Sequence, residues 1–197
     1  MEKKLPLDLI SAEIQNAARG RVVRLMFQDE ARFGRINDPR CCWAPAPFRP
    51  VVKSAVIREF TYAFAAVSPM DGVLDSLVLP EVSTETMNLF LEEVASRHHE
   101  EFIVMILDGA GWHTAKKLNI PENMHFHFLP PYSPELNPTE NLWDELREKG
   151  FANRAFNSMN AVEDQLVDQL ACLEKNPQRV HSITGWPWIV NLNLNAK

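Results

Sequence analysis

The first half of the chain contains three segments whose apolar residues are arranged as in strands. Residues 21–28 form a β-branched, apolar run that ends at charged residues, which predicts a buried strand. Residues 61–67 and 73–79 predict two more strands, because the Pro and Gly between them occupy turn positions. Residues 34–53 contain four prolines and predict a loop or a short hairpin.

The second half of the chain alternates strands and helices. Residues 102–107 are almost continuously apolar, as in a central strand buried on both faces, and residues 124–129 predict a shorter strand. Apolar residues at helical spacing predict helices over residues 83–99, 137–149 and 158–174. Three strands followed by alternating strands and helices predict an α/β fold, in which helices cover the faces of a mixed sheet.

Length and composition favour one globular domain. The 197 residues are 46% apolar and 23% charged, which is enough for one sizeable core. We expect a short helix over residues 7–18, and divide the chain into an N-terminal extension (1–20) and one domain (21–197). No apolar run approaches the roughly 20 residues that span a bilayer, and no secretory signal is visible. With three cysteines, an odd number, these features predict a cytoplasmic protein.

Charge is distributed unevenly along the chain. The net charge is −6, but residues 31–58 contain six Lys or Arg and a single acidic residue. Such a segment is most often a solvated surface, and the alternative is a basic strip that contacts the phosphates of nucleic acid. For the second case the best candidates are Arg32, Arg35 and Arg40.

Three acidic residues stand at the ends of predicted elements. Asp29 follows the first strand, Asp108 follows the central strand, and Glu140 lies in the first turn of a helix. Strand ends and helix starts face one crevice in open α/β sheets. Three carboxylates there repel each other without a cation, and their oxygens select Mg²⁺ or Mn²⁺ over zinc. The alternative is structural, because Asp often forms turns and Glu early in a helix complements the helix dipole.

Neighbouring acidic residues have weaker claims to a metal. Glu30 would point to the opposite face of the strand from Asp29, so we expect a structural or supporting role. Asp144 shares the helical face of Glu140, and either Asp144 or Glu145 is an alternative third ligand. Trp143 is expected to pack in the core behind this helix.

Four longer segments of the sequence resemble a single protein family. They are FQDEARFG (27–34), WAPAPFRPVV (43–52), LDGAGWHT (107–114) and LPPYSPELNPTENLWDELR (129–147). Together they resemble the mariner-like transposase superfamily, and most closely its bacterial insertion-sequence branch. The resemblance extends from about residue 20 to 155, and the last segment is the most specific.

The resemblance implies a ribonuclease H-like fold and a catalytic triad at Asp29, Asp108 and Glu140, which holds two Mg²⁺ or Mn²⁺ ions. It implies cut-and-paste transposition, in which the protein cleaves transposon-end DNA and joins it to target DNA. A homodimer on DNA, in the bacterial cytoplasm and nucleoid, follows from the same resemblance. It also favours a phosphate or metal-water contact for His113, whose alternative is a surface or helix-capping histidine.

Several features depart from the family pattern. Gly109 replaces the usual Asn, and the loop between Asp108 and Glu140 is slightly short. Relatives carry helix-turn-helix modules before the catalytic domain, whereas about 20 residues precede the first strand here. We therefore expect a fragment, a split gene product or a degenerate copy. The alternative functions are a non-catalytic remnant that binds DNA or protein, and a different ribonuclease H-like nuclease.

Overall fold

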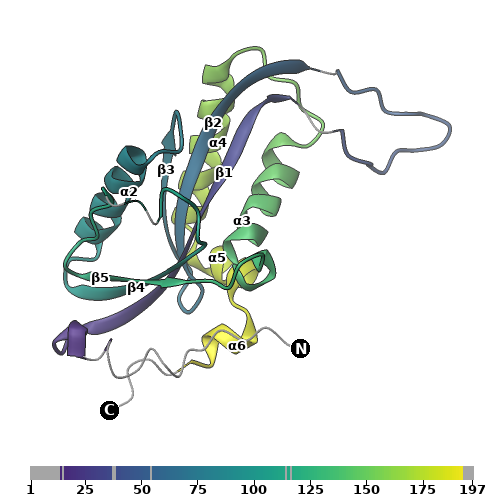
Figure 1. The fold of residues 1–197 in the computed structure, drawn as a ribbon. Coiled ribbons are helices and arrows are strands. Elements are labelled where there is room, and N and C mark those ends of the chain that lie inside the picture. The colour runs from purple at the N-terminus through teal and green to yellow at the C-terminus, as the bar shows by residue number, and fades with distance from the viewer. Residues whose placement is uncertain are drawn as a thin grey trace.

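The computed structural model contains a five-stranded mixed sheet with helices on both faces (Figure 1). It describes residues 14–192 apart from 15, 37, 38, 54, 114 and 116. The sheet has the strand order β3-β2-β1-β4-β5. The strands are β1 (Val22–Ile36), β2 (Val56–Ser68), β3 (Val73–Leu79), β4 (Glu101–Leu107) and β5 (Met124–Phe128). The predicted α/β fold with a mixed sheet is confirmed.

β1 lies at the centre of the sheet and joins its antiparallel and parallel halves. It pairs antiparallel with β2, which pairs antiparallel with β3 across a short turn. On its other side β1 runs parallel to β4, and β4 runs parallel to β5. Gly72 closes the β2–β3 turn with a φ of 75°, and a Cβ there would collide with the backbone of Pro177. The turn predicted between these two strands is thus confirmed.

The helices cover the two faces of the sheet unequally. One face is covered by α2 (Thr84–Arg97), whose apolar side packs on β1, β2 and β4. The other face carries α3 (Thr139–Leu146), α4 (Met159–Glu174), α5 (Pro177–Thr184) and α6 (Pro187–Val190). The helix expected to reach residue 149 changes to a π-helical turn over Arg147–Phe151. The short helices α5 and α6 were not predicted, because helices of eight residues or fewer show little periodicity.

The prediction that the first strand ends at residue 28 is wrong. β1 continues through Asp29 and Glu30 to Ile36, because β2 runs beside it and supplies hydrogen-bond partners. Strand propensity depends on such neighbours, which the local sequence does not reveal. The parallel pairing with β4 stops at Phe27 and Ile106. Asp29 therefore lies just beyond the carboxyl end of β4, inside a strand rather than after one.

Residues 39–53 form an irregular arm that projects from the ends of β1 and β2 (Figure 1). Its side chains are almost all exposed, and Trp43 and Val51 are nearly fully so. The loop predicted over residues 34–53 is confirmed for this part, but it begins later than expected since β1 extends to Ile36.

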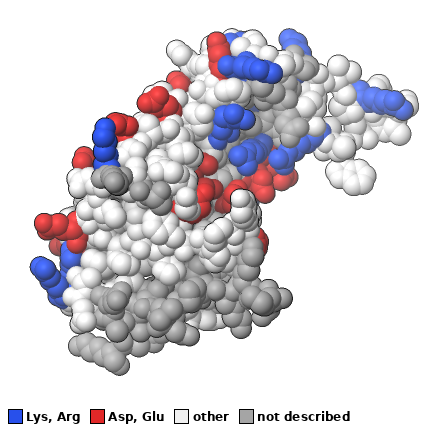
Figure 2. Space-filling model, in the orientation of Figure 1, with Lys and Arg blue, Asp and Glu red and all other residues white. Residues whose placement is uncertain are grey.

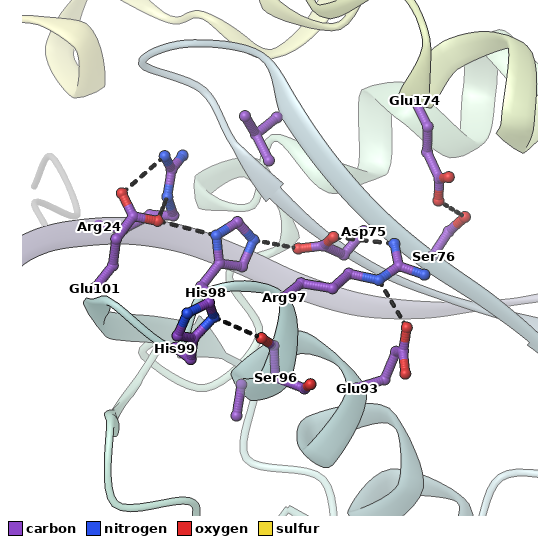
Figure 3. A network of polar contacts seen from close by, with 12 residues as sticks. Arg24, Asp75, Ser76, Glu93, Ser96, Arg97, His98, His99, Glu101 and Glu174 are labelled. Atoms are coloured by element: carbon purple, nitrogen blue, oxygen red, sulfur yellow. Dashed lines mark hydrogen bonds and ion pairs between the residues drawn. The ribbon is translucent and has the colours of Figure 1, made fainter.

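A polar network joins four elements near the amino end of β4, opposite the end where Asp108 lies (Figure 3). His98, which follows α2, lies 2.7 Å from Asp75 Oδ2 through Nε2 and 2.9 Å from Glu101 Oε2 through Nδ1. Arg24 of β1 donates to Glu101, and Arg97 donates to Asp75 at 3.1 Å. The hydrogen bond to Asp75 raises the pKa of His98 above its ordinary value, although burial opposes the shift. The network fastens α2 to β1, β3 and β4.

The N-terminal prediction is only partly covered by the structure. The helix expected over residues 7–18 lies mostly outside the described residues, although residues 16–18 are helical and Ala18 is buried in the core. In the part of the chain that the structure describes, no helix has the length and apolar character needed to cross a membrane.

Candidate active site

A cleft of about 470 Å³ opens at the carboxyl end of β4. It is lined by the three predicted carboxylates, Asp29 of β1, Asp108 after β4 and Glu140 of α3. The proline-rich segment 129–134, which precedes α3, forms much of the remaining wall. The fold thus brings together three acidic residues that are far apart in the sequence.

Asp29 is largely buried and is held by α3. Its Oδ2 accepts a hydrogen bond from Trp143 Nε1 at 2.8 Å. Burial, and then the negative charge of Glu140, raise the pKa of Asp29 from its ordinary value to about 7, although the Trp143 bond opposes the shift. Without a cation, Asp29 is therefore about half protonated near neutral pH.

The start of α3 is fastened to the strand next to Asp29. Asn137 Nδ2 donates to the carbonyl of Gln28 at 3.0 Å, and Thr139 Oγ1 donates to the carbonyl of Phe27 at 3.0 Å. Both side chains are buried. Because Phe27 and Gln28 directly precede Asp29, these two bonds set the first turn of α3, and with it Glu140, beside that residue.

Glu140 is the one acidic residue of α3 that lines the cleft. Burial raises its pKa, Arg147 opposes the shift, and the charges of Asp144 and Asp108 add to it. The Asp144 side chain is 72% exposed and lies 4.0 Å from Arg147. Glu145 accepts from Arg179 Nη2 at 2.6 Å, away from the cleft. The geometry therefore favours Glu140 over both alternatives as a third ligand.

Asp108 is the most exposed of the three carboxylates, with 58% of its side chain accessible. Its Oδ1 accepts from the backbone N–H of Ala110 at 2.9 Å and from His113 Nδ1 at 2.9 Å. The bond from His113 holds the pKa of Asp108 below its ordinary value. Asp108 is therefore ionised in the range where Asp29 takes up a proton.

The structure does not place His113 for the phosphate or metal-water contact expected from the sequence. The residue is 2% exposed, and its Nε2 lies 3.0 Å from Glu30 Oε1 while Nδ1 faces Asp108. Burial acts to lower the pKa of His113, but the bonds to Asp108 and Glu30 outweigh it and raise the pKa to about 9. Both ring nitrogens are engaged by carboxylates, so neither faces an incoming phosphate.

The three candidate arginines have different surroundings. Arg32 is exposed, and its guanidinium lies 4.4 Å from the ring centre of Phe60. Arg40 is exposed at the base of the arm. Arg35 instead forms an ion pair with Glu59 at 2.7 Å and donates to the carbonyl of Asn157, which gives it a structural role. Lys and Arg side chains lie next to acidic ones where the molecule is hollowed between its body and the arm (Figure 2).

The carboxylates of the cleft suit a divalent cation in charge and in ligand type. Asp29 and Glu140 have raised pKa values that arise partly from acidic neighbours, and a cation would remove this repulsion. Carboxylate oxygens are the ligands that Mg²⁺ and Mn²⁺ prefer. Among the described residues, however, no three His, Cys, Asp or Glu side chains are grouped closely enough to hold an ion.

A family model described as DDE superfamily endonuclease matches residues 24–163, which include the whole cleft-forming part of the chain. The chain belongs to this family.

This DDE endonuclease is also similar to individual proteins, one in sequence and several in fold. The uncharacterized protein y4pE/y4sA of Sinorhizobium fredii is 42% identical over 130 residues, which are 66% of this chain and 96% of that protein. The Mos1 mariner paired-end complex with Mn has a TM-score of 0.58 at 16% identity, over 81% of this chain and 53% of the Mos1 chain. The complex with Mg has a TM-score of 0.57 at 21% identity, over 85% and 54%. The ribonuclease H-like fold is thus confirmed, and the DDE endonuclease spans about half of the Mos1 chain.

The supporting role expected for Glu30 agrees with its contacts to Trp112 and His113, but the bonds that hold Asp29 and Glu140 of this DDE endonuclease were not predicted. Trp143 packs in the core as predicted, but its bond to Asp29 was not foreseen. Its position three residues after Glu140 places it on the same helical face, which was an available signal. The bonds of Asn137 and Thr139 join residues more than 100 positions apart, and no local pattern indicates them.

Proposed function

We propose that this DDE endonuclease domain is the catalytic domain of a mariner-type transposase, which cleaves transposon-end DNA and transfers the strand to target DNA. Asp29, Asp108 and Glu140 would be its catalytic residues and would hold two Mg²⁺ or Mn²⁺ ions. The observation that carries the proposal is that these three carboxylates, from three separate elements, line one cleft in a chain of the endonuclease family.

The three carboxylates differ in their protonation and in the bonds that hold them. When bound, divalent ions lower the pKa of water and stabilise the attacking and leaving oxygens of an in-line displacement. Asp29 would lose its proton as the cation arrives, while Trp143 keeps its Oδ2 in place. Asp108 is already ionised, and its Oδ1 is held by Ala110 and His113. Glu140 is set at the rim by the fastening of α3 to β1.

The same proposal covers the partners and the extent of the domain. Residues 21–197 would form the catalytic domain, and residues 1–20 an extension of it. Arg32 and Arg40, both exposed, would contact phosphates of the bound DNA. The relatives in the solved structures are named as paired-end complexes of Mos1. By analogy we propose that this protein acts as a homodimer on DNA, in the bacterial cytoplasm at the nucleoid.

Nicking of supercoiled plasmid by the whole chain, with and without Mn²⁺, tests the proposed activity. We expect metal-dependent nicking, and a loss in Asp29→Asn and Asp108→Asn beyond the roughly 10–100-fold typical of supporting residues. Asp168→Asn, on the exposed surface of α4, is the matched control and should nick like the parent. Isothermal titration should show that both cleft variants bind Mn²⁺ much more weakly than the parent, with a residual affinity that can still be measured.

Two results would change the proposal. Unchanged Mn²⁺ binding in both cleft variants would show that the metal site is misplaced. Mn²⁺ binding by the parent without any nicking would favour a remnant that binds DNA but no longer cuts it.

A further inference from the structure

The loop after β4 is fastened to β1 by two aromatic rings that meet on one carboxylate. Trp112 Nε1 donates to Glu30 Oε1 at 3.3 Å, and His113 Nε2 lies 3.0 Å from the same oxygen. Gln28 Nε2 also donates to it, at 2.9 Å. The Glu30 side chain is only 7% exposed. Glu30 is therefore a buried carboxylate, and the hydrogen-bond partners named here lie close in sequence to Asp29 and Asp108.

The other side of the His113 ring holds a cleft residue. Nδ1 lies 2.9 Å from Asp108 Oδ1 and 3.1 Å from the Asp108 carbonyl oxygen. The N–H of Ala110 donates to the same Oδ1. One carboxylate oxygen of this cleft residue is thus fixed by two hydrogen bonds.

Asp108 depends on this fastening more than the other two carboxylates do. Asp29 lies within β1 and Glu140 within α3, so hydrogen-bonded secondary structure holds both backbones. Asp108 follows the last residue of β4, and the next residues form an irregular loop. A Cβ added at Gly109 or Gly111 would meet no atom within 4 Å, so the space on that side of both glycines is open.

We propose that Glu30 and His113 are positioning residues that orient the Asp108 carboxylate toward the cleft. This inference rests on the proposed function, because it assigns Asp108 to a metal site. Burying a carboxylate beside an imidazole is costly, and apolar side chains could fill this space with less desolvation. Polar partners behind a metal ligand fix its orientation, and their loss typically weakens metal affinity about 10–100-fold.

Isothermal titration of the whole chain with Mn²⁺ tests the pair. We expect Glu30→Gln and His113→Gln each to bind Mn²⁺ about 10–100-fold more weakly than the parent. The double variant should bind no more weakly than the worse single variant, since the two residues act on Asp108 as one unit. In the Asp108→Asn background, adding His113→Gln should change the remaining Mn²⁺ affinity by less than about twofold. His99→Gln, at an exposed histidine whose Nδ1 lies 3.2 Å from the Ser96 carbonyl oxygen, is the matched control.

If Glu30 and His113 position Asp108, their effect on Mn²⁺ affinity depends on the Asp108 carboxylate; if they only stabilise the fold, it does not. A purely structural pair would lower the melting temperature, but it would weaken Mn²⁺ binding equally with and without the Asp108 carboxylate, and that result would overturn the inference. Parent-like affinity in Glu30→Gln and His113→Gln, with loss in Asp29→Asn and Asp108→Asn, would also overturn it while leaving the proposed function intact. Circular dichroism identifies folded variants. If His113→Gln does not fold, Glu30→Gln in the parent and in Asp108→Asn gives the same comparison.

Discussion

Asp29 and Glu30 are adjacent in β1 but contact different elements, because successive side chains of a strand point to opposite faces of the sheet. Asp29 faces α3, where it accepts from Trp143 and meets the charge of Glu140. Glu30 faces the loop after β4 and accepts from His113. One dipeptide thus supplies a proposed metal ligand and the support of a second one.

The raised pKa of Asp29 makes a prediction about stability in the absence of metal. A carboxylate with a pKa of about 7 in the folded state costs stability once both states are ionised, above pH 7. We expect Asp29→Asn to raise the free energy of unfolding at pH 8 by about 2–4 kcal/mol, and the gain to shrink as the pH falls toward about 4. Urea unfolding in the presence of EDTA measures it.

Asp144→Asn is the control for this experiment, because the Asp144 side chain is 72% exposed. It should change the free energy of unfolding by less than about 0.5 kcal/mol across the same pH range. Equal or lower stability of Asp29→Asn at pH 8 would show that the Asp29 carboxylate is not under strain from burial.

The choice of third ligand is a prediction about single side chains of α3. Asp144 lies one turn beyond Glu140, about 6 Å along the helix axis, too far to replace it at a metal–oxygen distance of about 2.1 Å. Glu140→Gln should therefore abolish metal-dependent plasmid nicking. Asp144→Asn and Glu145→Gln should retain measurable nicking. If Glu140→Gln still nicks the plasmid and Asp144→Asn does not, the third metal ligand is Asp144, one helical turn beyond Glu140.

Among the elements, α2 is fastened mainly at its C-terminal end. The network around His98 joins this end to β3 and β4, where Asp75 and Glu101 accept from the ring. Near its N-terminal end, Ser83 and Thr86 cap each other, and Asn88 bonds to the backbone of Lys117 and Asn119 in a loop rather than to the sheet. The polar network of Figure 3 is therefore the main directional link between α2 and the sheet.

This link predicts that α2 contributes to stability in a pH-dependent way. Because the pKa of His98 is raised in the folded state, its contribution is complete below its ordinary pKa and is lost as the pH rises through the folded value. We expect His98→Gln to lower the free energy of unfolding by about 1–3 kcal/mol at pH 6, and by less at pH 9. His99→Gln should be neutral at both. A pH-independent loss in His98→Gln would show that shape rather than charge matters.

On the scale of the molecule, an acidic protein presents basic side chains near the hollow between its body and the arm. The net charge is −6, yet Lys and Arg lie around the hollow between body and arm (Figure 2). Charge arranged in this way attracts phosphate locally while most of the surface repels it. DNA binding by this chain should therefore be weak, independent of sequence and steeply dependent on salt.

Replacing Arg32 and Arg40 together by Ala should reduce the slope of log affinity against log salt by about 2, since each phosphate contact contributes about 0.9. Fluorescence anisotropy with a labelled duplex measures the slope. Lys175→Ala is the control, because this exposed residue caps the far end of the 16-residue α4. A slope unchanged by the double replacement would place the DNA elsewhere.

Features that depend on local sequence patterns were predicted correctly, whereas features that depend on contacts between distant segments were not. The apolar run of β4 and the helical spacing of α4 are local patterns, and both elements appear where predicted. The end of β1 was misplaced because β2, not the local sequence, extends it. Arg35 was taken for a phosphate contact, and its ion pair with Glu59 and its bond to Asn157 became visible only in three dimensions.

The sequence by itself determined the order of elements and the identity of the three cleft carboxylates, because spacing and residue type are written along the chain. Tertiary structure alone decided how each carboxylate is held and charged. The pKa of Asp29 rises because α3 buries it beside Glu140, and Asp108 keeps its charge because His113 reaches it from the loop. Burial and charge proximity depend on distances between segments that folding brings together, and no local pattern encodes those distances.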